Sequence, residues 1–296
     1  MPSIRRSVLL YRLTPYFFIA VPLAIYLVWV VGPMLYTFYL SLTDWDGISE
    51  LRFIAYRNFS RLFRDRVFYK SFTNNIKWII SFITFPVAGG LALAMALNRE
   101  VPASRFFKAI FFFPMVLSFV VCGLIWSWMY QPDSGIINSL LRFVGLGAVA
   151  RGWLSDPSLV IWSIIFVAIW RQVGYVMLLY LAGLQSVNPD LVDASKVDGA
   201  GSWQSFRHVI LPQLAPITVV VVVISIIDSL RAFDLVYVMT KGGPFNSSSV
   251  LATFMYNEAF NNYRMGYGAS ISVILFAISL VFIFIYLIRM LRIEQR

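Results

Sequence analysis

Six long apolar tracts, separated by shorter polar segments, divide this chain along its length. A helix that crosses a bilayer needs roughly 17 to 25 predominantly apolar residues, because each residue adds about 1.5 Å. The tracts run from Tyr16 to Leu40, Ile76 to Leu97, Phe107 to Tyr130, Leu159 to Leu184, Ile217 to Val238 and Ser270 to Met290. Each is long enough to span, so the pattern predicts an all-α membrane protein with six transmembrane helices.

The first tract follows three arginines, Arg5, Arg6 and Arg12, as the apolar segment of a signal peptide would. It is longer than such a segment, and no small-residue cleavage site follows it. We therefore expect the first tract to remain in the protein as a membrane anchor.

Basic and apolar residues alternate at helical spacing between the first two tracts. Arg61, Arg64, Arg66 and Lys70 alternate with Leu62, Phe63, Val67, Phe68 and Phe72. This arrangement is typical of an amphipathic helix that lies in the membrane interface. We accordingly divide the chain into residues 1–75, with the N-terminal tail, the first transmembrane helix and the outer interfacial helix, and residues 76–296, a core of five transmembrane helices.

Counts of lysine and arginine do not orient the chain by themselves, since the loops on the two sides of the membrane carry similar totals. The excess on the outer side comes from the interfacial helix, and leaving it out of the count favours an N-terminus inside the cell. With six spans both termini are then cytoplasmic, and so are the loops at residues 98–106 and 185–212.

The 185–212 loop carries a stronger pattern than a simple connection requires. Asn188 can cap a helix that begins at Pro189, and Gly199 can end that helix in a left-handed conformation. Ser202 can cap a second helix, which Pro212 would end. The sequence therefore predicts two short helices around a glycine.

The second of these helices has one apolar face. Trp203, Phe206 and Ile210 fall at positions i, i+3 and i+7, while the other side is polar. We expect this face to pack down and the loop to act as a docking element.

Composition supports a membrane protein. Apolar residues make up 59% of the chain, mean hydropathy is +0.76 and only 13% of residues are charged, about half the usual charged share of a soluble domain. The net charge of +10 suits contact with a membrane surface. The sequence shows no folded basic domain that would favour nucleic acid as a partner.

Residues for catalysis or metal binding are few. Cys122 is the single cysteine and lies inside the third tract, where packing is its expected role. His208 is the single histidine, so a histidine metal site or a catalytic triad lacks its parts. The phosphate loop G-x-x-x-x-G-K-[ST] is absent as well. We therefore predict no catalytic residue, no metal and no cofactor, and expect any ATP hydrolysis to belong to another subunit.

Polar residues interrupt the fourth and fifth tracts. Arg171 lies near the middle of the fourth, where insertion costs about 2.5 to 3.5 kcal/mol, so we expect it to face a wet cavity or a partner. Asp228, Arg231 and Asp234 are spaced three apart, which fits either a mutually paired stripe at a helix interface or residues that face a pore. Tyr175 is one of several aromatic residues that can stack on a sugar ring. We take Arg171, Tyr175 and Asp228 as candidates for a translocation path.

The 185–212 loop also resembles a known motif. Asp193, Ala194, the triplet Asp198-Gly199-Ala200 and Leu211-Pro212 resemble the cytoplasmic EAA loop of bacterial ABC importer permeases, in which a glycine follows the acidic residue by six positions. Further fragments are similar, in the same order, to permeases of carbohydrate-uptake ABC importers, over about residues 58–292: SRFFKAIFFFP, IWSWMYQPDSGIINSLL, WLSDP, FDLVYVMTKGGP and YNEAFNNYRMGYGAS.

The resemblance is closer to one branch of that family. Trp203-Gln204, the extra first helix and the Gly-Gly-Pro outer loop look more like the F-type subunit of the maltose transporter than its G-type partner. The chain departs from the family pattern at Asp193 for Glu, Ser195 for the second Ala, Val209 for Ile and Lys241 for Gly. Replacing Glu by Asp keeps the charge and shortens the reach of the side chain by one methylene.

The resemblance implies the fold of a type I ABC importer permease with a cytoplasmic coupling helix in the bacterial inner membrane. It implies four kinds of partner besides membrane lipid: a second permease in a heterodimer, two copies of a cytoplasmic ATP-binding subunit, an extracytoplasmic solute-binding protein, and a sugar or related solute. Mono-, di- and oligosaccharides, polyols and glycerol phosphate esters all remain open. The residues it places at the ATPase contact are Asp193, Ala194, Ser195, Asp198, Gly199, Ala200, Phe206, Leu211 and Pro212.

Two other functions would require different features of the sequence. An intramembrane enzyme needs a nucleophile and base, or metal ligands, at membrane depth, whereas the sole histidine lies in a polar loop. An autonomous secondary transporter works without an ATPase, and many such folds carry internal repeats, of which none is obvious here.

Overall fold

The computed structural model of the chain describes residues 14, 16–98 and 103–294. The basic residues Arg5, Arg6 and Arg12 and part of the 98–106 loop lie outside the described residues. Within them the chain is helical, with one isolated bridge between Thr43 and Phe53 and no strand. The predicted all-α class is therefore confirmed.

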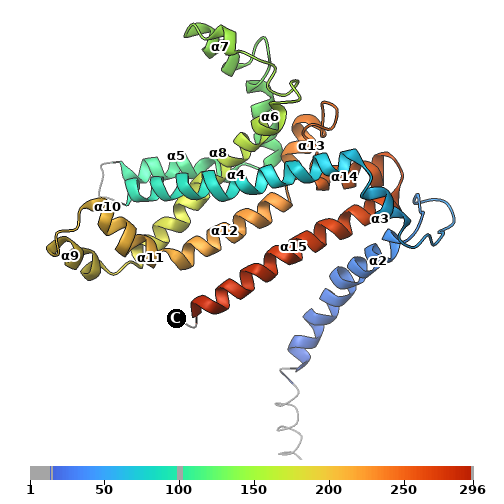
Figure 1. The fold of residues 1–296 in the computed structure, drawn as a ribbon, viewed down its shortest axis with the longest axis horizontal. Coiled ribbons are helices and arrows are strands. Elements are labelled where there is room, and N and C mark those ends of the chain that lie inside the picture. The colour runs from blue at the N-terminus through green and yellow to red at the C-terminus, as the bar shows by residue number, and fades with distance from the viewer. Residues whose placement is uncertain (1–13, 15, 99–102, 295–296) are drawn as a thin grey trace, which may run out of the picture. The chain divides into compact units, whose positions relative to one another are not determined.

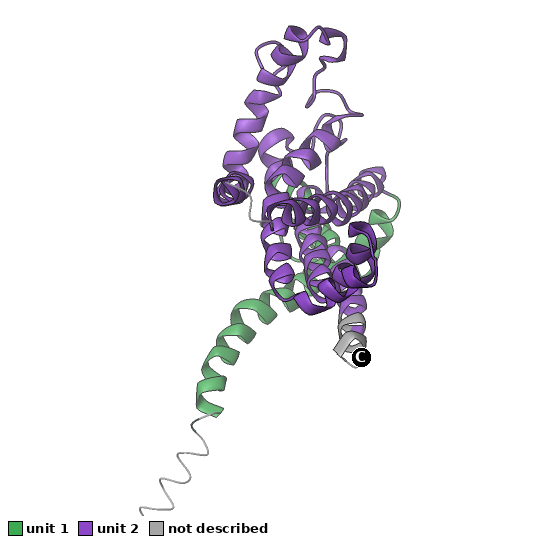
Figure 2. Ribbon diagram, turned by 90° about the vertical axis from the view of Figure 1, so that its left-hand side faces the viewer, with its two compact units in different colours: residues 1–64, 255–274 green, residues 65–254, 275–296 purple. Residues whose placement is uncertain are grey.

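The chain divides into two compact units (Figure 2). The first unit comprises residues 1–64 and 255–274, and the second comprises residues 65–254 and 275–296. The division that the sequence suggests, after residue 75, stays a prediction.

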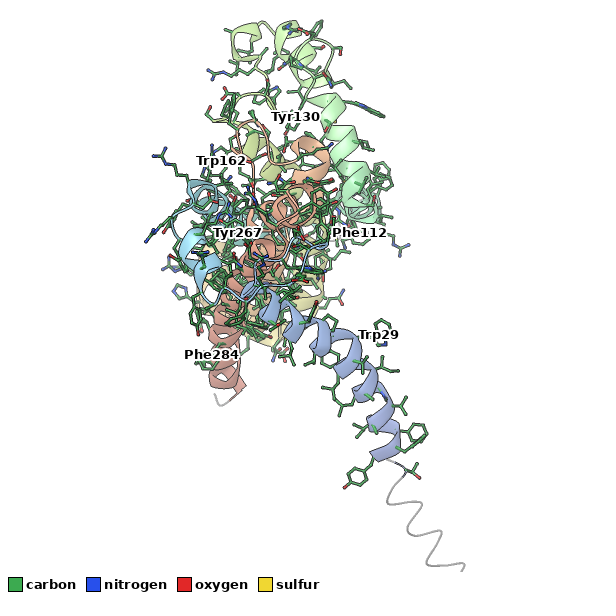
Figure 3. All side chains as sticks on the ribbon, turned by 90° about the vertical axis from the view of Figure 1, so that its right-hand side faces the viewer. Trp29, Phe112, Tyr130, Trp162, Tyr267 and Phe284 are labelled. Carbon is green, nitrogen blue, oxygen red and sulfur yellow. The ribbon has the colours of Figure 1, made fainter. Side chains whose placement is uncertain are left out.

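In the first unit, an apolar helix runs from Tyr16 to Ser41, through a π-helical turn, η1 (Leu27–Val31), and α2 (Gly32–Ser41). None of its most apolar stretch is buried in the structure, and Trp29 projects freely from it (Figure 3). A helix that is apolar on all sides requires a nonpolar environment on all sides. The predicted first transmembrane helix has this character.

The first unit also contains α3 (Arg57–Leu62), the whole of η4 (Asn257–Asn261) and the beginning of α15 (Met265–Glu294). The buried Asn58 side chain donates to the carbonyl oxygens of Ser41 and Thr43 at 2.9 and 2.8 Å. The guanidinium of Arg61 lies 4.6 Å from the ring centroid of Tyr267. These contacts hold α3 beside the end of α2 and the start of α15.

The second unit holds most of the helices, labelled in Figure 1. In chain order they are α4 (Arg66–Leu97), α5 (Ser104–Val116), α6 (Phe119–Met129), α7 (Ile136–Phe143), η2 (Gly147–Val149), α8 (Val160–Gln185), α9 (Pro189–Val197), α10 (Ser202–Ser205), η3 (Phe206–Ile210), α11 (Leu211–Gln213), α12 (Ala215–Leu230) and α13 (Asp234–Thr240). After them come α14 (Leu251–Tyr256) and α15 (Met265–Glu294), each of which extends across a boundary between the units, and η4, which lies between these two helices in the sequence.

Four helices in the described residues are long and apolar enough to span a membrane, and the number rises to six if each of two sharply bent pairs is one span. One pair is α5 with α6, bent by 100°, and the other joins residues 202–213 to α12 at 69°. Six spans are therefore confirmed on that counting. The fifth span differs from its predicted limits, because α12 ends at Leu230 and residues 234–240 form the separate helix α13.

The predicted interfacial helix is not continuous in the structure. Helix α3 ends at Leu62, and the residues from Arg66 onward belong to the long helix α4. The break has a local cause, since the Asp65 carboxylate accepts a hydrogen bond from the Val67 amide at 2.8 Å and so caps α4. An N-cap within the basic segment starts a new helix there.

Helix α8 is the centre of the second unit. Its buried residues join two apolar clusters, one shared with α4, α6 and α13 and one shared with α4 and α12. Cys122 is fully buried in the first cluster, as expected of a packing residue. Small residues allow the close approach that membrane helices need: a Cβ atom on Gly174 would overlap the carbonyl oxygen of Phe111, and one on Gly90 would come within 2.9 Å of the Met177 nitrogen.

Polar residues near the start of α4 hold the segment between α13 and α14. The Asn74 side chain donates to the carbonyl oxygens of Ser247 and Ser249, both at 2.8 Å, and the Lys70 ammonium donates to that of Phe245 at 3.1 Å. The Asn75 amide oxygen accepts from the Leu251 nitrogen at 2.8 Å. These contacts bury the serines of the segment at the end of α4 remote from the 185–212 loop.

Candidate functional site

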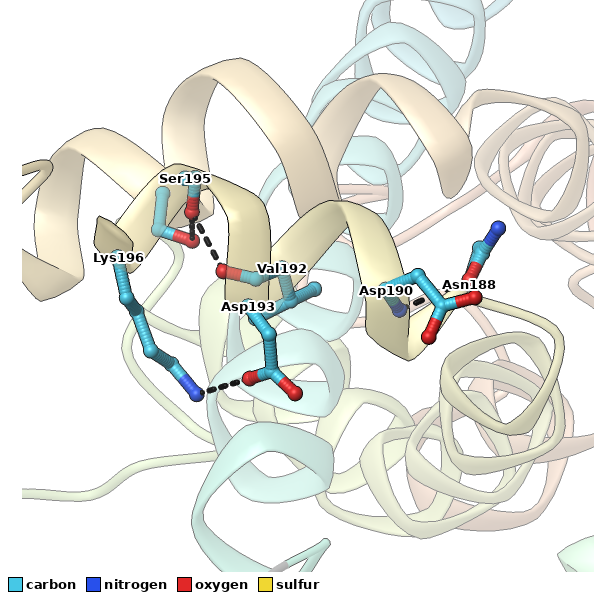
Figure 4. Close-up of polar contacts among 7 residues, drawn as sticks. Asn188, Asp190, Val192, Asp193, Ser195 and Lys196 are labelled. Atoms are coloured by element: carbon cyan, nitrogen blue, oxygen red, sulfur yellow. Dashed lines mark hydrogen bonds and ion pairs between the residues drawn. The ribbon is translucent and has the colours of Figure 1, made fainter. Parts of the chain in front are cut away.

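The 185–212 loop connects α8 to α12, and its first helix begins as the sequence predicts. The Asn188 side chain accepts a hydrogen bond from the Asp190 amide at 2.9 Å, and Pro189 is the first helical residue (Figure 4). The Gln213 side chain accepts from the Asn188 amide at 3.0 Å, which ties the two ends of the loop together.

Gly199 ends this helix in the left-handed conformation, with φ of +82°. The Gly199 amide donates to the Lys196 carbonyl at 3.0 Å and the Ala200 amide donates to the Ser195 carbonyl at 2.9 Å. This pair of bonds is the Schellman arrangement, which satisfies the free carbonyls of a helix end. No neighbouring atom lies within 4 Å of a Cβ built on Gly199. Glycine is therefore needed here for its left-handed backbone angle, and not because a side chain would lack space.

The second helix differs from its prediction at both ends. Gly201 is the N-cap, Ser202 is already helical, and the Gln204 side chain accepts from the Gly201 amide at 2.8 Å. The helix does not end at Pro212 but continues through η3 and α11 to Gln213 and turns at Leu214. Pro212 lies inside this helical run, directly after the π-helical turn η3, where the Leu211 amide donates to the Phe206 carbonyl five residues earlier.

The apolar face of the second helix packs only in part. Phe206 and Ile210 are half-buried, and Ile210 contacts the cluster shared by α4, α8 and α12. Trp203 is 67% exposed, with its ring 5.4 Å from that of Phe206. The prediction that all three would pack is therefore wrong for Trp203 within this chain.

Two polar contacts fix the shape of the loop (Figure 4). Asp193 and Lys196 form an exposed ion pair at 2.8 Å. Ser195, which also donates to the Val192 carbonyl, lies 2.8 Å from the Ser205 hydroxyl and so joins α9 to α10. Ser195 stands where the resembling family has alanine, so this hydroxyl contact is a feature of the present chain.

The structure places the predicted contact residues of the loop mainly on its surface. Asp193, Ala194, Asp198, Gly199, Leu211 and Pro212 are exposed, and Ser195, Ala200 and Phe206 are half-buried. Leu191 and Val197 add exposed apolar side chains beside the carboxylates, with Val197 88% exposed. The loop thus presents a mixed surface of acidic and apolar groups that suits a protein partner.

A cavity of about 190 Å³ lies at the end of α12 remote from this loop. Asp228, Arg231 and Asp234 all line it. The remaining walls are aromatic and aliphatic: Trp78, Phe82, Phe119, Phe233, Ala168, Ala232 and Leu235. No ion pair joins the three charged residues to one another among the described residues, so the mutually paired stripe is not formed there, and a pore-facing role of these residues stays a prediction.

Gln172, which the sequence reasoning missed, holds the key carboxylate of the cavity. Its side chain donates to an Asp228 carboxylate oxygen at 3.1 Å, from α8 to α12. A polar residue next to Arg171 in an apolar span was the available signal. Phe119, Phe233 and Trp78 had no signal that separated them from the other aromatic residues.

The other two candidates for the translocation path do not line this cavity. Arg171 is buried, and its guanidinium donates to the carbonyl oxygens of Leu117 at 3.1 Å and Met115 at 3.2 Å. Tyr175 lies one turn further along α8 and is half-buried. Their assignment to a translocation path stays a prediction.

Comparison with known proteins decides the family. The family model for the inner membrane component of binding-protein-dependent transport systems matches residues 87–295. The chain belongs to this family. Among its relatives, a probable ABC transporter permease of Bacillus subtilis, YurN, is 38% identical over 91% of this chain and 93% of its own length.

Other members of the permease family agree. The probable starch degradation products permease AmyD of Thermoanaerobacterium thermosulfurigenes is 34% identical and covers 88% of each chain. The trehalose/maltose permease MalF of Thermococcus litoralis is 31% identical over 90% of this chain and 89% of its own. A solved bacterial ABC transporter that imports the acidic polysaccharide alginate has the same fold, with a TM-score of 0.83 at 22% identity, over 98% of this chain and 99% of that one. The chain is thus a multi-pass permease of the ABC importer type.

Proposed function

We propose that this permease imports a sugar or a sugar-like solute and that the 185–212 loop couples its transport to ATP hydrolysis by a separate subunit. The observation that carries the proposal is the loop itself. Its capped helices, its Schellman turn at Gly199 and its surface of exposed carboxylates and apolar groups form a preorganised element between two spans.

The chemistry of the cavity supports a sugar as cargo. Two carboxylates and one guanidinium offer acceptors and donors for hydroxyl groups, and four aromatic rings offer flat apolar surfaces for a sugar ring. The names of AmyD and the MalF of Thermococcus litoralis, which carry starch products and trehalose or maltose, point to the same class of solute.

The assembly that this function requires has four further parts. A second permease would complete a heterodimer around the path, two copies of an ATP-binding subunit would bind below it, and a solute-binding protein would deliver the cargo from outside. The structural relative that imports alginate was solved with a solute-bound periplasmic protein, which supports the last partner.

The mechanism follows from the rigidity of the loop. Movement of the ATP-binding subunits would displace α9 and α10 as one body, because the Ser195–Ser205 contact and the Asn188–Gln213 contact join the helices. The movement would reach the cavity along α8 and α12, both of which begin or end at the loop.

Reconstitution tests this function. In liposomes the chain alone should show neither ATP turnover nor solute uptake, and both should appear when the second permease, the ATP-binding subunits and the binding protein are added. Uptake or ATP turnover by the single subunit would overturn the proposal.

Thiol labelling tests the orientation, in which both termini and the 185–212 loop are cytoplasmic. Position 202 is in the loop and position 143 in the segment at the opposite end of α8, and both are exposed. In a Cys122→Ser background, a membrane-impermeant reagent applied to intact cells should label Phe143→Cys and leave Ser202→Cys unlabelled. The reverse pattern would invert the proposed topology.

A further inference from the structure

The third span is broken in its middle, and the break exposes backbone groups. Helix α5 ends at Val116 and α6 begins at Phe119, after a bend of 100° (Figure 1). The last carbonyls of a helix have no partners within it, and within a bilayer they find no water. Leu117 donates its amide to the Pro114 carbonyl, and the Ser118 hydroxyl caps α6 by accepting from the Val121 amide.

Arg171 satisfies two of the carbonyls at this break. Its guanidinium donates to the carbonyl oxygens of Met115 and Leu117, which flank Val116, the last residue of α5. The guanidinium also stacks 3.9 Å from the ring centroid of Phe119, the first residue of α6. A cation at the C-terminus of a helix also meets the negative end of the helix dipole. One side chain of α8 therefore contacts the end of α5, the connecting residue and the start of α6.

Close packing brings α8 within reach of the break. Gly174 lies one turn from Arg171 and contacts the backbone of Phe111 and Phe112, where a side chain would not fit. Gln172, which follows Arg171 in the sequence, donates to the carboxylate of Asp228 on α12. Phe119 and Asp228 are on the walls of the same cavity, so adjacent residues of α8 hold a wall residue on each of two other helices.

From these contacts we propose that Arg171 is a positioning residue that holds the α5–α6 break in its bent form and thereby places Phe119 in the cavity wall. Without the guanidinium, two carbonyls at membrane depth lose their donors, and a straighter span that restores helical hydrogen bonds gains relative stability. Pro114 has no N–H and keeps some bend, so the span should straighten in part.

A distance measurement tests the geometry directly. Phe106 on α5 and Trp128 on α6 are both exposed and lie on the two sides of the break. At about 1.5 Å per residue, a straight helix would separate their Cα atoms by about 33 Å, and the bent pair brings them to about 20 Å. Spin labels at these positions, measured by electron paramagnetic resonance in the assembled transporter, should report the short distance in the wild-type protein and longer, broader distances in Arg171→Met.

Arg142 offers a matched control. On α7 it also donates to two carbonyl oxygens, those of Pro132 and Asp133, but it is remote from the break. Arg142→Met should leave the distance between the labels unchanged. An unchanged distance in Arg171→Met would overturn the proposal. If Arg171→Met does not accumulate in the membrane, Arg171→Gln, which keeps one donor group, is measured instead, and an unchanged distance there would overturn the proposal equally.

Uptake kinetics add a reading that general destabilisation would not produce. Displacing Phe119 should raise the solute concentration for half-maximal uptake about tenfold, which corresponds to about 1.4 kcal/mol of binding free energy. The maximal rate of uptake should fall by a smaller factor. This second reading rests on the proposed transport role of the cavity, whereas the distance reading does not. A lengthened distance with unchanged uptake would therefore support the role of Arg171 in the break and count against the cavity as the transport site.

Discussion

The hydrogen bonds that shape the 185–212 loop join residues at most 25 positions apart, whereas those that Arg171 and Gln172 make beside the cavity join residues 54 to 56 positions apart. The loop is exposed and built from caps and a glycine turn, while the cavity depends on the packing of α4, α6, α8, α12 and α13. Docking to another protein needs a surface whose shape is fixed by its own local contacts. A path for solute needs walls on several helices, so that a movement of one helix changes it.

This contrast leads to different expectations for variants in the two regions. A change in the packed helices should reduce the amount of folded protein, and a change in the loop should leave the protein in the membrane and stop its transport. Three sets of variants test this difference, from the largest expected effect to the smallest.

Gly174→Leu should have the largest effect, because its Cβ would overlap the backbone of α5, which cannot move aside cheaply. Overpacking costs about 1 to 3 kcal/mol and occasionally more, and here the obstacle is backbone, so most of the protein should be lost from the membrane. Gly147→Leu is the matched control, since a Cβ there approaches only the Arg142 side chain and backbone, at 3.6 Å or more. Size-exclusion chromatography of solubilised membranes measures both, and equal recovery would show that the α5–α8 contact is not essential.

Gly199→Val should keep the protein in the membrane and reduce uptake to about a tenth or less. A change of about 1.4 kcal/mol corresponds to a tenfold change in rate, and the strain expected here is of that size. The left-handed backbone at this position would cost valine about 1 to 3 kcal/mol, enough to change the turn between α9 and α10. Gly201→Ala is the control, because Gly201 has an ordinary φ of −66°. Normal uptake by Gly199→Val would mean that the loop is only a connector.

Charge at Asp193 should have a smaller and more specific effect. The exposed pair with Lys196 contributes less than about 1 kcal/mol, so Asp193→Lys should leave the protein stable while it weakens retention of the ATP-binding subunits and uptake. Asp193→Glu should retain most activity. Asp190→Lys reverses an exposed charge on the same helix outside the motif. Equal losses of uptake for Asp190→Lys and Asp193→Lys would mean that any added positive charge on this helix repels the ATP-binding subunit, and that Asp193 has no specific role.

The same contrast explains what the sequence could predict. Asn188, Pro189 and Gly199 act through their own backbone or that of neighbouring residues, and their roles are confirmed. The N-cap of the second helix is Gly201 and not Ser202, because the Gln204 side chain accepts a hydrogen bond from the Gly201 amide. Two adjacent residues competed for the N-cap position. The break after Val116 had a local signal in Pro114 and Ser118, although the apolar composition of the tract concealed it.

Long-range contacts had no such signal. Nothing near Arg171 in the sequence indicates that its acceptors are at the end of α5, and the cavity has walls on five helices that are brought together only by the fold. The contact roles of Asp193, Ala194, Ser195, Asp198 and the other loop residues remain predictions, because contact with an ATP-binding subunit is a property of an assembly.

Photo-crosslinking tests that contact most directly. Val197 in the loop and Phe143 at the opposite end of α8 are both 88% exposed, so a benzophenone side chain at either position has equal access to a partner. In membranes that contain the assembled transporter, irradiation should join position 197 to the ATP-binding subunit and leave position 143 without that product. A product from position 143, or none from position 197, would contradict the assignment of the 185–212 loop as the coupling element.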